Sequence, residues 1–348
     1  DSTWAQFYTI SDGFFTVSDP KMANANGQLL TSYRRGDGSL RVAGIDLKDS
    51  TINDLSPNFA TNITTSRICT ETEEYDGSAN VYLLYIATYI YGQTTTTASF
   101  MRSTDNGKNW SAPLLIDAVA VGVDGSAFGI DWSTGGLFIA YAGVGANANN
   151  MFVRKSTDRG NSFGLRRLFD ADSDLKFGLS VAAFGDNNVY MIAGIRNRTG
   201  IETARIYRST DGFNSNFVND VSQERSNVSN PSVSHDIAGN FYVAYTIGLN
   251  VYAQFMNNGV YQTIPSLVGN SPDSSKKTAI YGFTSPRSTA GAFAAWVMGS
   301  SANKQVLGNK YDLISPFAVI RLSPRSLSFG GVPTGTASTK FFTISYLG

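Results

Sequence analysis

Short apolar runs recur along the chain at a nearly constant spacing. The six strongest begin 54, 55, 52, 52 and 51 positions apart and cover residues 28–33, 82–87, 137–142, 189–194, 241–246 and 292–297. Each run is strand-sized and rich in β-branched, aromatic or small residues, and several follow turn-forming pairs such as Asn26-Gly27 and Gly239-Asn240. Because apolarity within a run is nearly continuous, we expect strands that are covered on both faces.

A repeat of about 52 residues is long enough for four short strands and their turns. This period is typical of propeller blades, and no convincing amphipathic helix interrupts it. The pattern predicts an all-β fold, a six-bladed β-propeller over residues 1–320, with each apolar run as the inner strand of a blade. A pair of β-sandwiches also has regular strands, but even spacing over nearly the whole chain argues against it. Residues 7–17 are a candidate strand for closing the last blade.

Charge and composition exclude several classes of function. The 27 Lys and Arg residues balance 27 Asp and Glu residues, so no net field attracts nucleic acid or an anionic membrane surface. The longest apolar runs fall far short of the roughly 20 residues that cross a bilayer, so no membrane insertion is expected. One cysteine and one histidine leave no intrachain disulfide, Cys-rich metal cluster or multi-histidine zinc site.

Three repeats carry a serine–aspartate motif after the apolar run, 53 and 53 residues apart. Its positions are Ser103, Asp105, Gly107 and Trp110; Ser156, Asp158, Gly160 and Phe163; and Ser209, Asp211, Gly212 and Phe217. We expect the hydroxyl and carboxylate to accept N–H groups of the turn, glycine to allow a positive φ, and the aromatic ring to pack under the hairpin. A carboxylate bound within its own turn does not reach a substrate, so a structural role is favoured over a catalytic one.

These motifs resemble the Asp box of sialidases and related propellers. The first two match S-x-D-x-G-x-x-[W/F], and the third differs because Gly212 directly follows Asp211 and one extra residue precedes Phe217. The resemblance covers about residues 7–320 and implies the sialidase-like superfamily, which includes sialidases, other glycoside hydrolases and many noncatalytic surface propellers. The fold alone does not decide among these functions.

The catalytic pattern of sialidases is not found in the sequence. The family shares an Arg-Ile-Pro motif in the first blade, two further arginines that bind the substrate carboxylate, a Tyr–Glu pair and an Asp acid/base. The first blade here contains Arg34 and Arg35 without that motif, and the nearest match, around Arg67, lacks the proline. Arg34, Arg35 and Arg67 are therefore only candidate ligand-binding residues. Three of the five glutamates lie in residues 71–77, where we expect a solvated loop.

Asp170, Asp172 and Asp174 alternate as the carboxylates of a calcium loop do. However, Leu175 stands at the sixth position, where such loops have glycine, and no glutamate follows at the twelfth. A solvated turn between blades is the favoured interpretation, with calcium as the alternative. No other cofactor is expected.

Residues 321–348 depart from the repeat. The segment LSPRSLSFGGVPTGT at 322–336 and the later FFTIS resemble the opening of an immunoglobulin-like sandwich of the ASH or choice-of-anchor type. Such a sandwich needs about 100 residues, so only its first strands are expected here. A truncated domain is one interpretation, and strands donated to another subunit of a fibre are the other.

Asp1 replaces an initiator methionine, which predicts that a secretory signal has been removed. We expect an extracellular or cell-surface location in a bacterium. The favoured function is a noncatalytic propeller that binds a glycan or a surface protein in adhesion or extracellular structure. The alternatives are a divergent glycoside hydrolase or lyase, and a fibre subunit that self-associates through the C-terminal strands.

Overall fold

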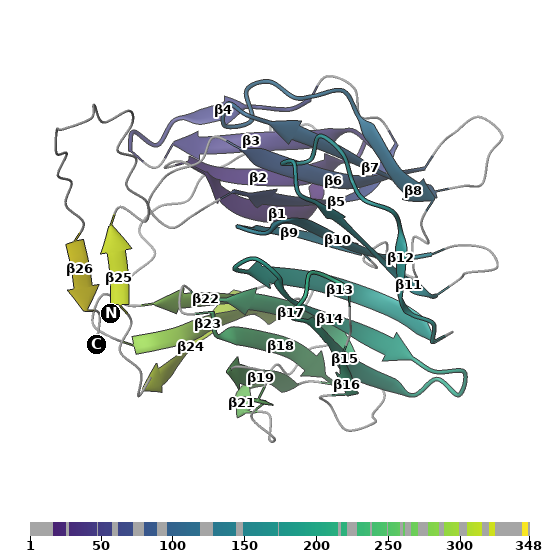
Figure 1. The fold of residues 1–348 in the computed structure, drawn as a ribbon, viewed down its shortest axis with the longest axis vertical. Coiled ribbons are helices and arrows are strands. Elements are labelled where there is room, and N and C mark those ends of the chain that lie inside the picture. Colours follow the sequence, from purple (N-terminus) through teal and green to yellow (C-terminus); the bar gives the residue numbers. More distant parts are fainter. Residues whose placement is uncertain are drawn as a thin grey trace, which may run out of the picture.

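The computed structural model shows a chain built of β-strands. It describes residues 17–25, 28–46, 48–57, 62–71, 80–88, 96–118, 128–143, 149–172, 174–214, 217–220, 228–236, 239–248, 250–257, 260–261, 266–270, 278–284, 289–298, 305–314, 320–323 and 343–346. The strands of this part form antiparallel sheets that follow one another along the chain (Figure 1). No helix in the described residues is long and apolar enough to cross a membrane.

Five sheets have at least four strands, and we number them as blades 1–5. Blade 1 comprises β1 (Val17–Ala25), β2 (Gln28–Arg35), β3 (Leu40–Asp46) and β4 (Ile52–Asp54). Blade 2 comprises β5 (Ile63–Thr70), β6 (Val81–Thr88), β7 (Thr96–Ser103) and β8 (Leu114–Ala118). Blade 3 comprises β9 (Phe128–Ser133), β10 (Gly136–Ala142), β11 (Met151–Ser156) and β12 (Arg167–Asp170).

Blades 4 and 5 continue the pattern. Blade 4 comprises β13 (Leu175–Phe184), β14 (Asn188–Arg196), β15 (Glu202–Ser209) and β16 (Phe217–Asp220). Blade 5 comprises β17 (Val228–His235), β18 (Phe241–Ile247), β19 (Asn250–Asn257), β20 (Val260–Tyr261) and β21 (Ser266–Asn270). The last strands are β22 (Thr278–Thr284), β23 (Thr289–Met298), β24 (Gln305–Ile314), β25 (Ile320–Ser323) and β26 (Thr343–Tyr346).

The fold is a β-propeller, but the described residues form five blades and not the predicted six. The sixth apolar run, residues 292–297, lies in β23, and within the described residues β23 belongs to a three-stranded sheet with β22 and β24. A sequence repeat indicates how many units a fold contains, but it does not show whether each unit has its fourth, outer strand. Strand β22 lies against β17 and β18, so this sheet follows blade 5.

Every apolar run forms the second strand of its sheet, not the inner strand as predicted. The first strands β1, β5, β9, β13 and β17 contact one another in succession and lie innermost. The second strands are nearly continuously apolar because both of their faces are covered by neighbouring blades. An inner strand and a second strand therefore give the same sequence pattern.

Each hydrophobic core cluster lies between two successive blades. Along β10, Leu137, Ile139 and Tyr141 pack toward blade 2, whereas Phe138 and Ala140 pack toward blade 4. Alternation of side chains along a strand thus supplies one core on each face. Burying each large apolar side chain contributes about 1.5–3 kcal/mol, so the interfaces between blades supply most of the hydrophobic stabilisation.

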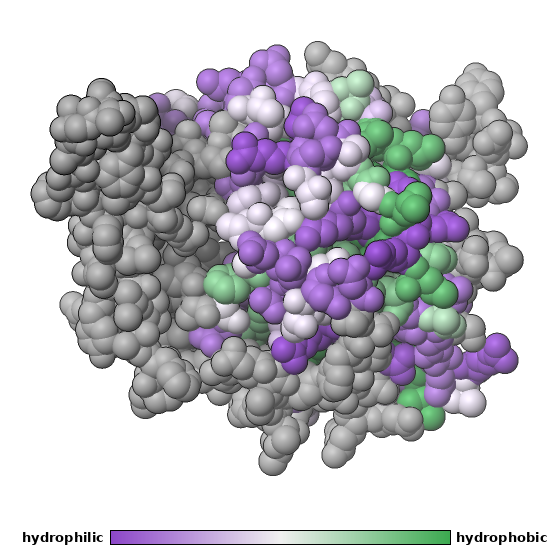
Figure 2. Space-filling model, in the orientation of Figure 1, coloured by the Kyte–Doolittle hydropathy of each residue, from purple (hydrophilic) through white to green (hydrophobic). Residues whose placement is uncertain are grey.

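Exposed apolar side chains lie on the outer strands of blades 2 and 3. Leu115 on β8 and Leu168 on β12 are exposed, and Leu165, just before β12, is 89% exposed. Figure 2 shows hydrophobic surface over this side of the molecule, while the middle of the view is mostly hydrophilic. The apolar side chains on β8 and near β12 lie away from the first strands, whereas Met22, which is 67% exposed, lies on the first strand β1.

Strands β25 and β26 pair antiparallel with each other, from Ile320 opposite Tyr346 to Ser323 opposite Thr343. Figure 1 shows this ribbon beside the blades. A two-stranded ribbon is too small to identify an immunoglobulin-like sandwich, so the assignment of residues 321–348 to such a domain stays a prediction. The suggested closing strand at residues 7–17 lies outside the described residues apart from Val17, which begins β1.

Candidate functional site

The antiparallel blades give the propeller two different ends. The connections from first to second and from third to fourth strand lie at one end, which we call the turn face. The connections from second to third strand and the links from one blade to the next lie at the other end, which we call the linker face. The serine–aspartate motifs lie on the turn face, whereas Arg34, Arg35 and the loop containing Asp170 lie on the linker face.

The three serine–aspartate turns have one hydrogen-bonding pattern. The serine Oγ donates to an aspartate Oδ1 at 2.7, 2.8 and 2.9 Å, in Ser103–Asp105, Ser156–Asp158 and Ser209–Asp211. The same Oγ accepts, at 2.8 Å each, the N–H groups of Gly107, Gly160 and Phe213. One hydroxyl thus joins the end of the third strand to the residue four positions later.

The aspartates of the first two turns are fully engaged by their own turns. Asp158 accepts the N–H of Ser162 at 2.9 Å and its hydroxyl at 2.6 Å. These bonds and that from Ser156 lower the pKa of Asp158 to about 2. Asp105 accepts the N–H and side-chain amide of Asn109 at 2.8 and 2.6 Å in the same way. A carboxylate so strongly stabilised as an anion is a poor base or nucleophile at neutral pH.

The third turn uses a different aromatic residue from the one predicted. Phe213, not Gly212, occupies the position of Gly107 and Gly160, with a φ of 78° and 4% exposure. Its ring contacts Phe138 and Phe169 edge-on, with centroids 5.3 and 5.5 Å apart. Counting four residues from the serine would have identified Phe213, because that N–H binds the hydroxyl.

Phe217, the aromatic residue that the motif predicted, begins β16, and its side chain lies outside the described residues. Gly212 has a φ of 66° and occupies the position of Asn106 and Arg159, which have φ values of 61° and 56°. The third turn therefore has the backbone shape of the other two, with the residue types moved by one position.

The aromatic residues of the turns all reach the preceding blade. Trp110 donates its Nε1–H to the carbonyl of Leu55 at 2.8 Å, and Phe163 lies edge-on to Phe100 with centroids 5.0 Å apart. Phe213 makes the equivalent contact with blade 3. These side chains thus join blades in addition to closing their own hairpins.

The candidate arginines do not form one cluster. Arg34 and Arg35 are adjacent in β2, so their side chains leave opposite faces of the strand. Arg35 lies 4.0 Å from the Asp37 carboxylate, while the buried Nε of Arg34 has no hydrogen-bond partner among the described residues. Arg67 donates to the carbonyl of Ser66 at 2.9 Å and lies 4.6 Å from the centroid of the Phe128 ring. Arg67 is therefore directed toward blade 3.

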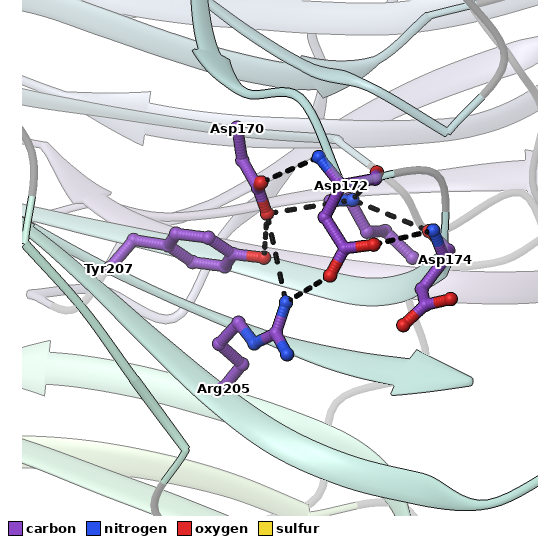
Figure 3. A network of polar contacts seen from close by, with 6 residues as sticks. Asp170, Asp172, Asp174, Arg205 and Tyr207 are labelled. Atoms are coloured by element: carbon purple, nitrogen blue, oxygen red, sulfur yellow. Dashed lines mark hydrogen bonds and ion pairs between the residues drawn. The ribbon is translucent and has the colours of Figure 1, made fainter. Parts of the chain in front are cut away.

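The Asp170 loop joins blades 3 and 4 through its side chains (Figure 3). Asp170 Oδ2 accepts the Tyr207 hydroxyl at 2.8 Å, and Arg205 donates to Asp172 Oδ2 at 2.6 Å. The Asp174 carboxylate points away from this network in Figure 3. In the part of the chain that the structure describes, no three acidic, histidine or cysteine side chains are placed to hold a metal ion. The geometry therefore does not support the calcium loop considered from the sequence.

Glu71, which was expected in a solvated loop, is only 6% exposed. Its carboxylate accepts the Tyr82 hydroxyl at 2.9 Å and the Asn80 amide at 2.6 Å, and it forms a 3.0 Å ion pair with Arg159 of blade 3. Burial, together with the Glu71 charge, raises the pKa of Tyr82. Glu71 thus joins the turn faces of blades 2 and 3.

Blade 5 repeats the arrangement of Glu71. Asp236 accepts the Asn240 amide and the Tyr242 hydroxyl, both at 2.8 Å. The shared sequence signal is Asn-x-Tyr at the start of the second strand, with an acidic residue after the first strand. This signal was missed because it spans a loop of different length in each blade.

Asp131 lies on the first strand of blade 3 and binds the first strand of blade 4. Its Oδ2 accepts the N–H of Ala183 at 2.8 Å. Burial raises the pKa of Asp131, although the nearby His235 lowers it. The His235 ring packs against Phe184, with centroids 5.4 Å apart. The only histidine therefore lies near an acidic group whose charged form is disfavoured.

The comparisons with known proteins concern the fold. No family model and no curated protein matches the sequence. The structure is similar to an α-L-arabinanase from Penicillium chrysogenum solved with arabinobiose, at 12% identity over 85% of this chain and 93% of that one (TM-score 0.58). A protein of unknown function from Dyadobacter fermentans is 12% identical over 86% and 95% (TM-score 0.56). AofleA from Arthrobotrys oligospora is 12% identical over 88% and 92% (TM-score 0.51). These likenesses show the propeller fold alone.

Gly160→Ala and Gly107→Ala separate backbone strain from packing between blades. Both glycines have φ near 80°, but a Cβ on Gly160 would lie 2.6 Å from the Phe100 ring, whereas the nearest atom to one on Gly107 is 3.5 Å away. Each change should cost about 1–2 kcal/mol for the positive φ. Gly160→Ala should lose about 1–3 kcal/mol more through overpacking, measured by urea unfolding. If the two variants lose the same free energy of unfolding, the Gly160 turn is not packed tightly against blade 2.

Asp131→Asn tests the buried carboxyl. A raised pKa in the folded state means that the stabilising contribution is present at low pH and is lost as pH rises through the folded pKa. Asparagine keeps an oxygen acceptor for Ala183 but has no charge. The melting temperature of the variant relative to wild type should therefore rise as pH increases from about 4 to 7.

Asp37→Asn is the control, because its melting temperature relative to wild type should change with pH in the opposite direction. Hydrogen bonds from Ser39 lower the pKa of Asp37, so its contribution is present at neutral pH and is lost on acidification. The melting temperature of Asp37→Asn relative to wild type should fall as pH rises. If the difference in melting temperature between Asp131→Asn and wild type does not change with pH, the pKa of Asp131 is not raised in the folded protein.

Proposed function

We propose that this chain is a noncatalytic propeller of the bacterial exterior that binds carbohydrate through its linker face. The observation that carries the proposal is the use of acidic side chains at the junctions between blades. Asp117 of blade 2 accepts the Tyr141 hydroxyl of blade 3 at 2.7 Å and pairs with Arg166 at 3.1 Å. Asp170 and Glu71 contact the next blade in the same manner.

Glycoside hydrolysis has a different requirement. Two carboxyl groups must face one cleft, separated by about 5–5.5 Å or about 6.5–9.5 Å, and one of them must be free to move a proton or attack the sugar. The lone pairs of Asp117, Asp170 and Glu71 are used by Tyr, Arg and Asn donors. These contacts support a structural role for the carboxylates.

The linker face has the groups that such binding needs. First strands β1, β5, β13 and β17 each have a register shift in the half toward this face, and bulges of this kind redirect side chains next to binding sites. Arg34, near the linker-face end of β2, carries a guanidinium group that suits sugar hydroxyl or carboxylate oxygens, and Arg67 carries another near the middle of β5. The arabinanase of similar fold was solved with arabinobiose, so carbohydrates are the first ligands to test. The serine–aspartate turns support placing the chain among the sialidase-like propellers.

One observation favours the alternative of a divergent glycoside hydrolase. Asp131 lies on an innermost strand, and burial raises its pKa, which is the property that a general acid needs near neutral pH. Its bond to the backbone of Ala183 also fits a purely structural role. Activity measurements on Asp131→Asn decide between them.

Binding should be measured on a glycan array with wild type, Arg34→Ala and Arg67→Ala. Arg102→Ala is the matched control, because Arg102 lies near the turn face and donates to the Arg159 carbonyl at 3.2 Å. We expect each of the first two changes to weaken binding by about tenfold, or ~1.4 kcal/mol, with no loss in the control. If all four proteins bind equally well, carbohydrate does not bind through the linker face.

The same glycans should be assayed for release of reducing sugar. The binding proposal expects no turnover by wild type. Turnover that Asp131→Asn abolishes while the variant remains folded would replace this proposal with the hydrolase.

A further inference from the structure

The first serine–aspartate turn, which follows β7 of blade 2, contains an asparagine followed by a glycine. These residues are Asn106 and Gly107. The position of Asn106 is occupied by Arg159 in the second turn and by Gly212 in the third. Of the three turns, only the first therefore places a carboxamide beside the peptide nitrogen that the serine hydroxyl binds.

A carboxamide in this position is open to attack by the peptide nitrogen that follows it. The nitrogen of Gly107 gives up its proton to a base and forms a bond to Cγ of Asn106. The C–N bond of the carboxamide breaks, and its nitrogen leaves as ammonia after taking a proton from solvent. Water then opens the succinimide ring to aspartate or isoaspartate, so the reaction needs no oxidant or reductant. Glycine favours the attack because it has no Cβ to hinder the approach.

The native turn holds the attacking nitrogen in another interaction. The N–H of Gly107 donates to Ser103 Oγ at 2.8 Å, and the N–H of Asp105 donates to the same oxygen at 3.3 Å. Ser103 is only 1% exposed, and Gly107 is buried. A base in solvent therefore does not reach the Gly107 proton while the turn is closed, and attack on Cγ requires the nitrogen to leave Ser103.

The carboxamide oxygen of Asn106 is not held in a comparable way. It is buried and has no hydrogen-bond partner among the described residues. The backbone of Asn106 has a φ of 61°, in the left-handed region that asparagine adopts more readily than most residues. No bond to this oxygen opposes reaction at Cγ, so the protection lies in the bond from Gly107 to Ser103.

We propose that Asn106 is a covalent modification site that Ser103 keeps unreactive in the native turn, and that it deamidates spontaneously when this turn opens. Isoaspartate inserts one additional atom into the main chain before Gly107, so the N–H no longer meets the hydroxyl in the native geometry. The turn then does not close in its native form, and the bond from Trp110 to Leu55 of blade 1 is weakened. This inference does not depend on the proposed carbohydrate binding.

Peptide mass spectrometry after incubation at mildly alkaline pH tests the proposal. Trypsin releases residues 103–108, in which Asn106 is the only asparagine, so the mass of this peptide reports conversion of the amide to an acid. Wild type is incubated in buffer and in guanidinium chloride. Modification should be at least about tenfold faster in the denaturant, because in the native protein the turn must first open.

Ser103→Ala should increase the rate of modification in the folded protein by about tenfold, because two N–H groups lose their acceptor. Ser103→Thr keeps the hydroxyl and should retain the slow rate of wild type. Ser156→Ala is the matched control, because it removes the same hydroxyl from the turn that contains Arg159. Its rate at Asn106 should equal that of wild type.

Equal rates for wild type in buffer and in denaturant would overturn the proposal, as would equal rates for wild type and folded Ser103→Ala. An increase in Ser156→Ala as large as that in Ser103→Ala would assign the effect to lost stability and would also overturn it. If Ser103→Ala does not fold, hydrogen exchange of the Gly107 N–H in wild type decides. The exchange and modification rates should rise by the same factor as denaturant is added, because one opening exposes both groups. Different factors would contradict the proposal.

Discussion

The second strand of each blade is apolar on both faces, and only the neighbouring blades can cover it. In β10, Leu137, Ile139 and Tyr141 are buried against one neighbour and Phe138 and Ala140 against the other. A blade of this kind has no stable existence alone, because each of its faces is half of a core. The rest of the structure serves to hold successive blades at the distance that these cores require.

Polar side chains at the edges of the cores also hold successive blades together. Trp110 on the turn face, and Asp117 and Asp170 toward the linker face, bind across to an adjacent blade. A carboxylate that accepts a tyrosine hydroxyl and faces an arginine stabilises the junction through its charge. The acidic residues that would first suggest a hydrolase are therefore engaged in assembling the propeller.

The sequence allowed the six second strands to be located, because continuous apolarity at a fixed period has few other causes. It could not show that the sixth unit has three strands in the described residues, since that depends on pairing between segments. Phe213 was missed because the motif was aligned on glycine, whereas the serine hydroxyl binds the N–H of whichever residue is fourth. Glu71 was missed for a related reason: local composition suggests a solvated loop, but its side chain is buried by partners on β6 and in blade 3.

The most direct test of this account is the melting temperature of Glu71→Gln. Glu71 is buried and its contacts reach both its own blade and Arg159 of the next. If junction carboxylates hold the blades together, removing this charge should lower the melting temperature by several degrees, because hydrogen bonds to a buried charge contribute about 1.5–3 kcal/mol. An unchanged or higher melting temperature would contradict the claim that junction carboxylates stabilise the contacts between blades. It would instead fit a functional residue, because such residues commonly reduce stability.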